Sequence, residues 1–402
     1  MRIVARAMLS VFAGWIAASC LTAAAVHAVP VYPAADPDPF YAAPRNLSAH
    51  RPGDVLAVRT MPPILLFPDT VVTLIKFRST NSTGKPIAAT TTVLTPGNHV
   101  SDGPLLSYQH MINALGTRCA VSRELYTTDP TMVIREAPAL NLVLRRGWTV
   151  ALPDHLGPTS AYGAARLGGQ ITLDGIRAAQ RLSGLGLTHS PVAMAGYSGG
   201  GMATAWAAAM APRYAPELNL VGAAEGGVPM NMVTMVRALG YSPHPAFGLA
   251  MAAAIGLERE YPNRLPVSAQ LNTAGMAVRD RMANSCTNEI LAAGAGHSAM
   301  EFAKSANLAA DAQARRVVEE NSLELYDGVP KTAVFEWHSP VDALLPVESI
   351  INTMHRYCRA GTRVHTELVP SPDHLTTAIL GLPAATIWLA DRFAGLPAPS
   401  TC

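Results

Sequence analysis

Apolar and polar residues alternate along the first part of the chain. The alternation runs through residues 53–61, 72–79 and 87–94, where Thr and Val are enriched, and a short apolar run follows at 105–108. Period-two patterning of this kind is typical of strands that bury one face. We therefore predict that these segments begin a β-sheet and that the first three strands are antiparallel.

From residue 137 onwards, short apolar runs alternate with segments of helical spacing. The apolar runs cover residues 148–153, 192–195, 218–224, 332–337 and 363–369, and the helical segments cover 139–146, 169–182, 202–210, 347–360 and 376–393. Apolar runs separated by helices indicate buried parallel strands. This part of the chain therefore predicts the α/β fold class.

Residues 227–321 interrupt that alternation, because they contain no clear strand pattern. Helical segments rich in Ala, Met and Leu occur there at 245–257, 291–303 and 308–318. An insertion of this kind between two core strands predicts a helical cap or lid, with ordinary core helices as the alternative. We expect one core, formed by residues 29–226 and 322–402, with the cap inserted into it.

Residues 1–28 have the features of a secretory signal peptide. A short basic stretch precedes an apolar segment at 7–18, and small residues suit cleavage after Ala28. The apolar segment is shorter than the roughly 20 residues that a membrane span needs. We therefore predict export to the extracellular space or the cell envelope, with lipidation at Cys20 as the alternative.

The composition favours a folded protein with a large core. Of 402 residues, 49% are hydrophobic and 14% are charged, against roughly 25% charged residues in an average soluble protein. The net charge is +2, and residues 1–28 contain two arginines and no acidic residue, so the rest of the chain is neutral. A neutral protein has no electrostatic basis for binding nucleic acid or an acidic membrane surface.

Four cysteines follow the predicted cleavage site: Cys119, Cys286, Cys358 and Cys402. An even number in an exported chain favours two disulfides, and four cysteines allow three pairings that the sequence alone does not separate. No Cys-x-x-Cys motif or Cys/His cluster points to zinc. We expect neither a metal nor a cofactor.

A candidate catalytic motif follows the apolar run at 192–195. The five residues Gly196-Tyr197-Ser198-Gly199-Gly200 match the G-x-S-x-G motif, and an Ala-rich helical segment comes next. A strand, a sharp turn with Ser and a helix are the context that a nucleophile elbow requires. We predict that Ser198 is a catalytic nucleophile and that the Gly199 N–H faces its hydroxyl; a structural Gly-rich turn is the alternative.

A serine nucleophile needs a base, and the base needs an orienting acid. Asp342 and His374 each follow a predicted parallel strand, in the chain order Ser, Asp, His that this architecture uses. Carboxyl ends of parallel strands meet at one edge of a sheet, so these two residues are the predicted acid and base. The alternatives are a turn or helix-capping role for Asp342 and a surface position for His374.

Other polar residues fall on loops at the same predicted edge. We expect His110, His155 and Tyr197 to line the substrate pocket. His338 precedes Asp342 by four residues and is expected to support that loop.

Several motifs taken together resemble the secretory lipase family over residues 41–402. They are Ser107-Tyr108-Gln109 before a loop that ends at Cys119, Asp154-His155-Leu156-Gly157, Leu173-Asp174-Gly175-Ile176, the elbow motif, His338-Ser339-Pro340-Val341-Asp342, and His374-Leu375-Thr376. The resemblance implies an α/β-hydrolase fold with a helical lid between the sixth and seventh core strands. It also implies a triad of Ser198, Asp342 and His374.

The same resemblance implies an oxyanion hole and a disulfide pairing. The oxyanion donors would be the backbone N–H groups of Gly199 and Asn113; a fungal member has Asp at the latter position, and the backbone donor survives that change. The implied disulfides are Cys119–Cys286 and Cys358–Cys402.

The sequence therefore predicts a secreted carboxylic-ester hydrolase, a lipase or a broad esterase. Its partners would be acyl-ester or lipid substrates, with transient contact to lipid interfaces. An acyltransferase or a peptidase on the same core is the alternative enzyme, and an inactive lipid-binding protein is the alternative from another class.

Overall fold

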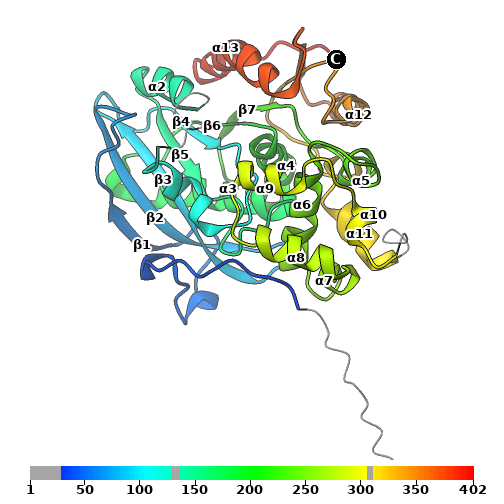
Figure 1. Cartoon of the computed structure of the whole chain (residues 1–402). Helices are drawn as coiled ribbons and strands as arrows, with labels where there is room; N and C mark the ends of the chain where they lie inside the picture. The colour runs from blue at the N-terminus through cyan, green and yellow to red at the C-terminus, as the bar shows by residue number, and fades with distance from the viewer. Residues whose placement is uncertain (1–28, 129–131, 133–135, 306–310) are drawn as a thin grey trace, which may run out of the picture.

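The computed structural model describes residues 29–128, 132, 136–305 and 311–402, so the predicted signal peptide lies outside the described residues. These residues form one nine-stranded sheet with helices on both faces (Figure 1). The strands are β1 (Val55–Thr60), β2 (Thr70–Thr80), β3 (Pro86–Pro96), β4 (Leu105–Gln109), β5 (Thr149–Pro153), β6 (Val192–Tyr197), β7 (Leu220–Gly226), β8 (Val334–His338) and β9 (Val364–Leu368).

The strand order confirms the predicted antiparallel start and the α/β fold class. Along the sheet the order is β1-β2-β3-β5-β4-β6-β7-β8-β9. Strands β1, β2 and β3 are antiparallel, as is the β3–β5 pair, and all later pairs are parallel. The carboxyl ends of β6, β8 and β9 therefore open at one edge of the sheet.

Helices cover the two faces of the sheet. In order along the chain, the helices of the described residues are α1 (Val121–Glu124), α2 (Ala137–Arg145), α3 (Ala165–Arg181), α4 (Gly199–Tyr214), α5 (Met232–Gly240), α6 (Phe247–Glu260), α7 (Val267–Gln270), α8 (Thr273–Met282), α9 (Thr287–Gly294), α10 (Ala299–Phe302), α11 (Ala312–Glu320), α12 (Val347–Arg359) and α13 (His374–Phe393). One core cluster buries apolar residues of α3, α4 and α12, and a second buries those of α2 and α13 on the other face. Both clusters take residues from the sheet, so the strands are buried on both sides, as their apolar runs predict.

Helices α5 to α11 occupy the stretch of chain between β7 and β8. They have a small core of their own, which includes Phe247, Met251, Ile255, Met282 and Ile290. Their apolar residues are therefore divided between this core and the surface that faces the sheet.

The predicted helix at 291–303 is wrong. Helix α9 ends at Gly294, and α10 begins only at Ala299. Gly296 between them has a φ of +77°, a left-handed conformation that favours glycine and ends the helical path. The sequence pattern also did not predict α5 and α8. Part of the expected segment at 308–318 lies outside the described residues, and α11 forms the remainder.

The chain end is joined to the body of the protein by a disulfide between Cys358 of α12 and Cys402. None of the helices in the described ranges is both long enough and apolar enough to span a membrane.

Candidate active site

Ser198 lies between the end of β6 and the start of α4. Its φ of 54° and ψ of −119° place a non-glycine residue in an unfavourable backbone region, as a sharp elbow requires. A Cβ at Gly196 would lie 2.6 Å from the backbone of Gly200, and a Cβ at Gly200 would lie 2.0 Å from the carbonyl oxygen of Gln109. Both flanking positions therefore need glycine because other backbone passes too close to them.

The structure brings His374 between Ser198 and Asp342. The Nε2 atom of His374 is 2.9 Å from the Ser198 hydroxyl, and its Nδ1 atom is 2.7 Å from Oδ2 of Asp342. Asp342 follows β8, and His374 is the first residue of α13, after β9. The helix begins there because the Asp373 side chain caps it by accepting a hydrogen bond from the Thr376 N–H.

The carboxylate of Asp342 has a donor on each oxygen. Its Oδ1 accepts hydrogen bonds from the N–H groups of Leu344 at 2.9 Å and Leu345 at 3.1 Å, while Oδ2 faces His374. Burial raises the pKa of Asp342, but the hydrogen bond and charge of His374 and the two backbone donors outweigh burial, so this pKa lies below its usual value. Asp342 is therefore ionised at neutral pH and suited to stabilise an imidazolium.

Tyr197, which the sequence places in the substrate pocket, contacts the imidazole of His374 and is not among the residues that line the cavity in front of Ser198. Its hydroxyl donates a hydrogen bond of 2.6 Å to the carbonyl oxygen of His374, and the two rings lie 5.0 Å apart. Burial and the charge of Asp342 raise the pKa of the Tyr197 hydroxyl, which keeps it a donor. The residue before the elbow serine thus fixes the position of the His374 imidazole.

Two buried carboxyl groups lie on adjacent strands below this site. Glu225 of β7 pairs in register with Glu336 of β8, and Glu336 Oε2 lies 2.8 Å from Nδ1 of His338. Burial raises the pKa of both carboxyls, that of Glu225 further because Glu336 is its neighbour. Burial lowers the pKa of His338, but Glu336 outweighs it and the pKa is raised. His338 bonds within this group rather than to Asp342.

The candidate oxyanion loop follows β4 and passes close to the elbow. The side chain of Asn113 lies against Gly199, where a Cβ would be 2.5 Å from Oδ1 of Asn113. The Asn113 N–H faces the hydroxyl of Thr287 at 3.4 Å, a long contact. Sequence reasoning missed Thr287, because only the folded chain brings the start of α9 to this loop.

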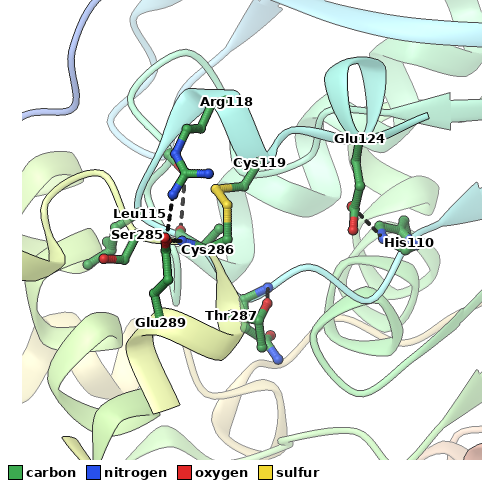
Figure 2. The surroundings of a disulfide bond; sticks show 12 residues. His110, Leu115, Arg118, Cys119, Glu124, Ser285, Cys286, Thr287 and Glu289 are labelled. Carbon is green, nitrogen blue, oxygen red and sulfur yellow. Dashed lines mark hydrogen bonds and ion pairs between the residues drawn. A yellow bond between two sulfur atoms is a disulfide. The ribbon is translucent and has the colours of Figure 1, made fainter. Parts of the chain in front are cut away.

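A disulfide and backbone hydrogen bonds fix this loop to the segment between α8 and α9 (Figure 2). Cys119 is bonded to Cys286, the residue before Thr287, which is the pairing that the family resemblance implies. The N–H of Leu115 donates to the Ser285 carbonyl at 2.9 Å. The ion pair of Arg118 with Glu289 is exposed and adds little by comparison.

His110 and His155, which the sequence places in the substrate pocket, are not among the residues that line the cavity in front of Ser198. They face a separate cavity of about 340 Å³ behind the oxyanion loop. The imidazole of His110 lies between Glu124, at 2.8 Å, and Glu136, at 3.4 Å. Burial lowers the pKa of His110, but the two carboxylates raise it to about 9. Burial and the charge of His110 lower the pKa of His155 to about 3.

The cavity in front of Ser198 has a volume of about 510 Å³. Ser198, Gly199, Asn113 and Thr287 lie on its inner wall, and helices of the 227–321 segment form most of the rest. Its apolar lining includes Met232, Met235, Leu239, Phe247, Met251, Leu257 and Leu271. Within the residues that the structure describes, no group of three or more His, Cys, Asp or Glu side chains is placed to hold a metal ion.

Comparison with known protein families gives a match over most of the chain. The model of the family described as "Secretory lipase" matches residues 128–401. The chain belongs to the secretory lipase family. Lipase A of Arthroderma benhamiae is 31% identical over 388 residues, which cover 91% of this chain and 81% of that protein. Lipase 5 of Candida albicans is 32% identical over 384 residues, which cover 91% of this chain and 82% of that protein.

Solved structures agree with this membership. Candida antarctica lipase A in its closed state has a TM-score of 0.85 and 27% identity, covering 91% of this chain and 89% of that one. A rice cell wall degrading esterase from Xanthomonas oryzae has a TM-score of 0.67 at 17% identity and shares the fold alone. The secretory lipase described here therefore has an α/β-hydrolase fold and belongs among lipases and esterases.

We predict that the two disulfides of this secretory lipase differ in their effect on turnover. The double substitution Cys119→Ser/Cys286→Ser should lower the free energy of unfolding by about 2–5 kcal/mol. It should also lower kcat, because the loop that carries Asn113 loses its covalent link to α9. Urea unfolding and kcat on a water-soluble ester measure the two effects.

The matched control is Cys358→Ser/Cys402→Ser, which removes the bond at the chain end. This variant should lose stability and keep its kcat at a temperature where it is folded. Equal kcat values for the two double variants would contradict the expected role of the Cys119–Cys286 bond.

The charge of His110 predicts a loss of stability at alkaline pH. Because the folded-state pKa of about 9 lies above the ordinary 6.5, protonation of His110 stabilises the fold fully below about pH 6.5. That contribution disappears as the pH rises through about 9. The advantage of the native protein over His110→Gln in free energy of unfolding should shrink by about 3 kcal/mol between about pH 6 and pH 10. His189→Gln, at an exposed surface histidine, is the control and should show no such trend.

Proposed function

We propose that this secretory lipase is a serine carboxylic-ester hydrolase that works through an acyl-enzyme. The observation that carries the proposal is the hydrogen-bonded chain from Ser198 through His374 to Asp342, at the inner wall of a large apolar cavity. Nucleophile, base and orienting acid in this contact are the arrangement that activates a serine hydroxyl.

In the proposed mechanism, the Ser198 oxygen attacks the carbonyl carbon of the ester while its proton passes to Nε2 of His374. Asp342 keeps the other ring nitrogen protonated and stabilises the imidazolium. The carbonyl oxygen becomes an oxyanion, which the N–H groups of Gly199 and Asn113 receive. To bind there, the oxyanion takes the place of the Thr287 hydroxyl as the partner of Asn113.

The tetrahedral intermediate collapses when His374 returns its proton to the leaving alkoxide, so the alcohol departs and the acyl group stays on Ser198. A water molecule then attacks the acyl carbon and gives a proton to His374. Collapse of this second intermediate releases the carboxylic acid, and Ser198 regains its proton from His374.

The proposal includes the organisation of the chain and its location. Residues 1–28 direct export and are removed, and residues 29–226 with 322–402 form the catalytic core. Residues 227–321 form a cap whose Met-rich lining encloses the acyl chain of the substrate. The substrates are triacylglycerols or other esters with apolar acyl groups.

The assignment of the triad predicts a specific pattern of labelling and turnover. An organophosphonate probe should form an adduct on Ser198 that peptide mapping locates, and Ser198→Ala should abolish it. Asp342→Asn should retain the fold and lower kcat by about 10⁴-fold, because the imidazole loses its orienting acid. Asp327→Asn, at an exposed carboxylate in an ion pair with Arg213, is the matched control and should keep its kcat. Continued labelling of Ser198→Ala, or normal turnover of Asp342→Asn, would refute the triad.

The apolar cavity predicts a dependence on acyl length. Burial of each additional CH₂ contributes about 0.8 kcal/mol, so kcat/KM on p-nitrophenyl esters should rise about fourfold per carbon until the cavity is filled. Ala250→Phe, which places a large side chain on the cavity wall, should lower kcat/KM for long acyl chains and leave acetate nearly unchanged. Ala312→Phe, on the exposed side of α11, is the control. A flat profile with acyl length would contradict an acyl-binding cavity.

A further inference from the structure

The outer face of α13 carries large apolar side chains that the described part of the chain leaves uncovered. Leu375, Ile379, Leu380 and Ile387 are 55%, 56%, 53% and 59% exposed. Their spacing places them along one side of the helix, while Trp388 and Leu389 point into the core. Residues 375–390 contain no charged side chain. An apolar outer stripe on a surface helix indicates a binding surface.

This stripe is continuous with the mouth of the substrate cavity. Leu375 directly follows the proposed base His374, and it both lines the cavity and is exposed. Val236 and Tyr241, on and after α5, also line the cavity and are 40% and 37% exposed, so they belong to its rim. Figure 1 shows α13 at the outer edge of the molecule, and the cap helix α5 is likewise at the periphery. We call the surface formed by the outer side of α13 and these rim residues the α13 face.

We propose that the α13 face docks this secretory lipase on the surface of aggregated, water-insoluble ester, with the cavity mouth against the lipid. The inference rests on the proposed ester hydrolysis and assigns the contact to the core helix that begins with the base, rather than to the cap alone. A substrate molecule that leaves the lipid layer beside Leu375 enters the cavity without crossing water.

The extent and chemistry of the α13 face favour a lipid surface over a second copy of the chain. Four Leu and Ile side chains that are each slightly more than half exposed offer roughly 400 Å² of apolar surface, whereas a stable interface buries about 800 Å² on each partner. A lipid layer accepts such side chains without a complementary shape. Since residues 375–390 carry no charge, α13 itself contributes apolar contacts rather than attraction to a charged headgroup.

The test compares Ile379→Gln/Ile387→Gln with the native protein. Neither residue lines the cavity, so kcat/KM on dissolved p-nitrophenyl acetate should stay unchanged. Adsorption to a trioleoylglycerol emulsion, measured by co-flotation, and the rate of its hydrolysis should each fall about tenfold or more, because two apolar contacts with the lipid are lost. Adsorption of the native protein should not weaken when NaCl is added, because the contact is apolar.

Val100→Gln is the matched control, since Val100 is also exposed but lies before β4, at the opposite edge of the sheet from Ser198. It should adsorb and hydrolyse as the native protein does. Unchanged adsorption of the double variant, or an equal loss in Val100→Gln, would overturn the docking proposal. A dimer in sedimentation that the double variant abolishes would also overturn it and make the face a contact between copies. Absence of activity on the dissolved ester would instead reject the proposed function itself.

Discussion

The close approach of two backbones at the elbow is the constraint on which the site depends. Gly200, in the first turn of α4, passes so near the carbonyl of Gln109 that no side chain fits between them. The same region is held by a hydrogen bond of 2.7 Å from the Thr204 hydroxyl to the Gln109 side chain. Because Gln109 ends β4, this contact fixes the start of the oxyanion loop relative to Ser198. Nucleophile and candidate oxyanion donors are thus set by one packing contact.

His374, the proposed base, is held by the residue that precedes the elbow serine. Tyr197 precedes Ser198 and bonds the carbonyl of His374, so the strand that presents the nucleophile also fixes the first residue of α13. Asp342 reaches the imidazole from the end of β8 and is itself oriented by two backbone N–H groups. The three side chains of the proposed triad follow the ends of three strands. Each of them has either a hydrogen-bond partner outside the proposed triad or a constrained backbone that limits its freedom.

The strands and the residues of the proposed triad could be predicted from the sequence, because apolar runs and strand-end loops have local signatures. No local sequence pattern shows which cavity the side chain of a loop residue will face. His110 and His155 lie near the expected edge but face the space behind the oxyanion loop, where Glu124 and Glu136 hold His110. Apolar residues occur on all sides of α13, as is typical of a fully buried helix. The sequence pattern therefore did not predict that the outer side of this helix is exposed to solvent. The prediction of one helix at 291–303 is wrong because a short turn that contains Gly296 separates α9 from α10, although the apolar residues there have helical spacing.

The bond between Cys119 and Cys286 also limits how the segment between β7 and β8 can move. That segment joins the core at its two chain crossings, and the disulfide adds a third covalent attachment next to α9. A segment attached at two points can rotate about the line that joins them. The disulfide is a third attachment, and it therefore opposes rotation of the segment as one rigid body. The space for a substrate is then set by side chains within the segment, such as the methionines of α5 and α6 that line the cavity, rather than by rotation of the whole segment.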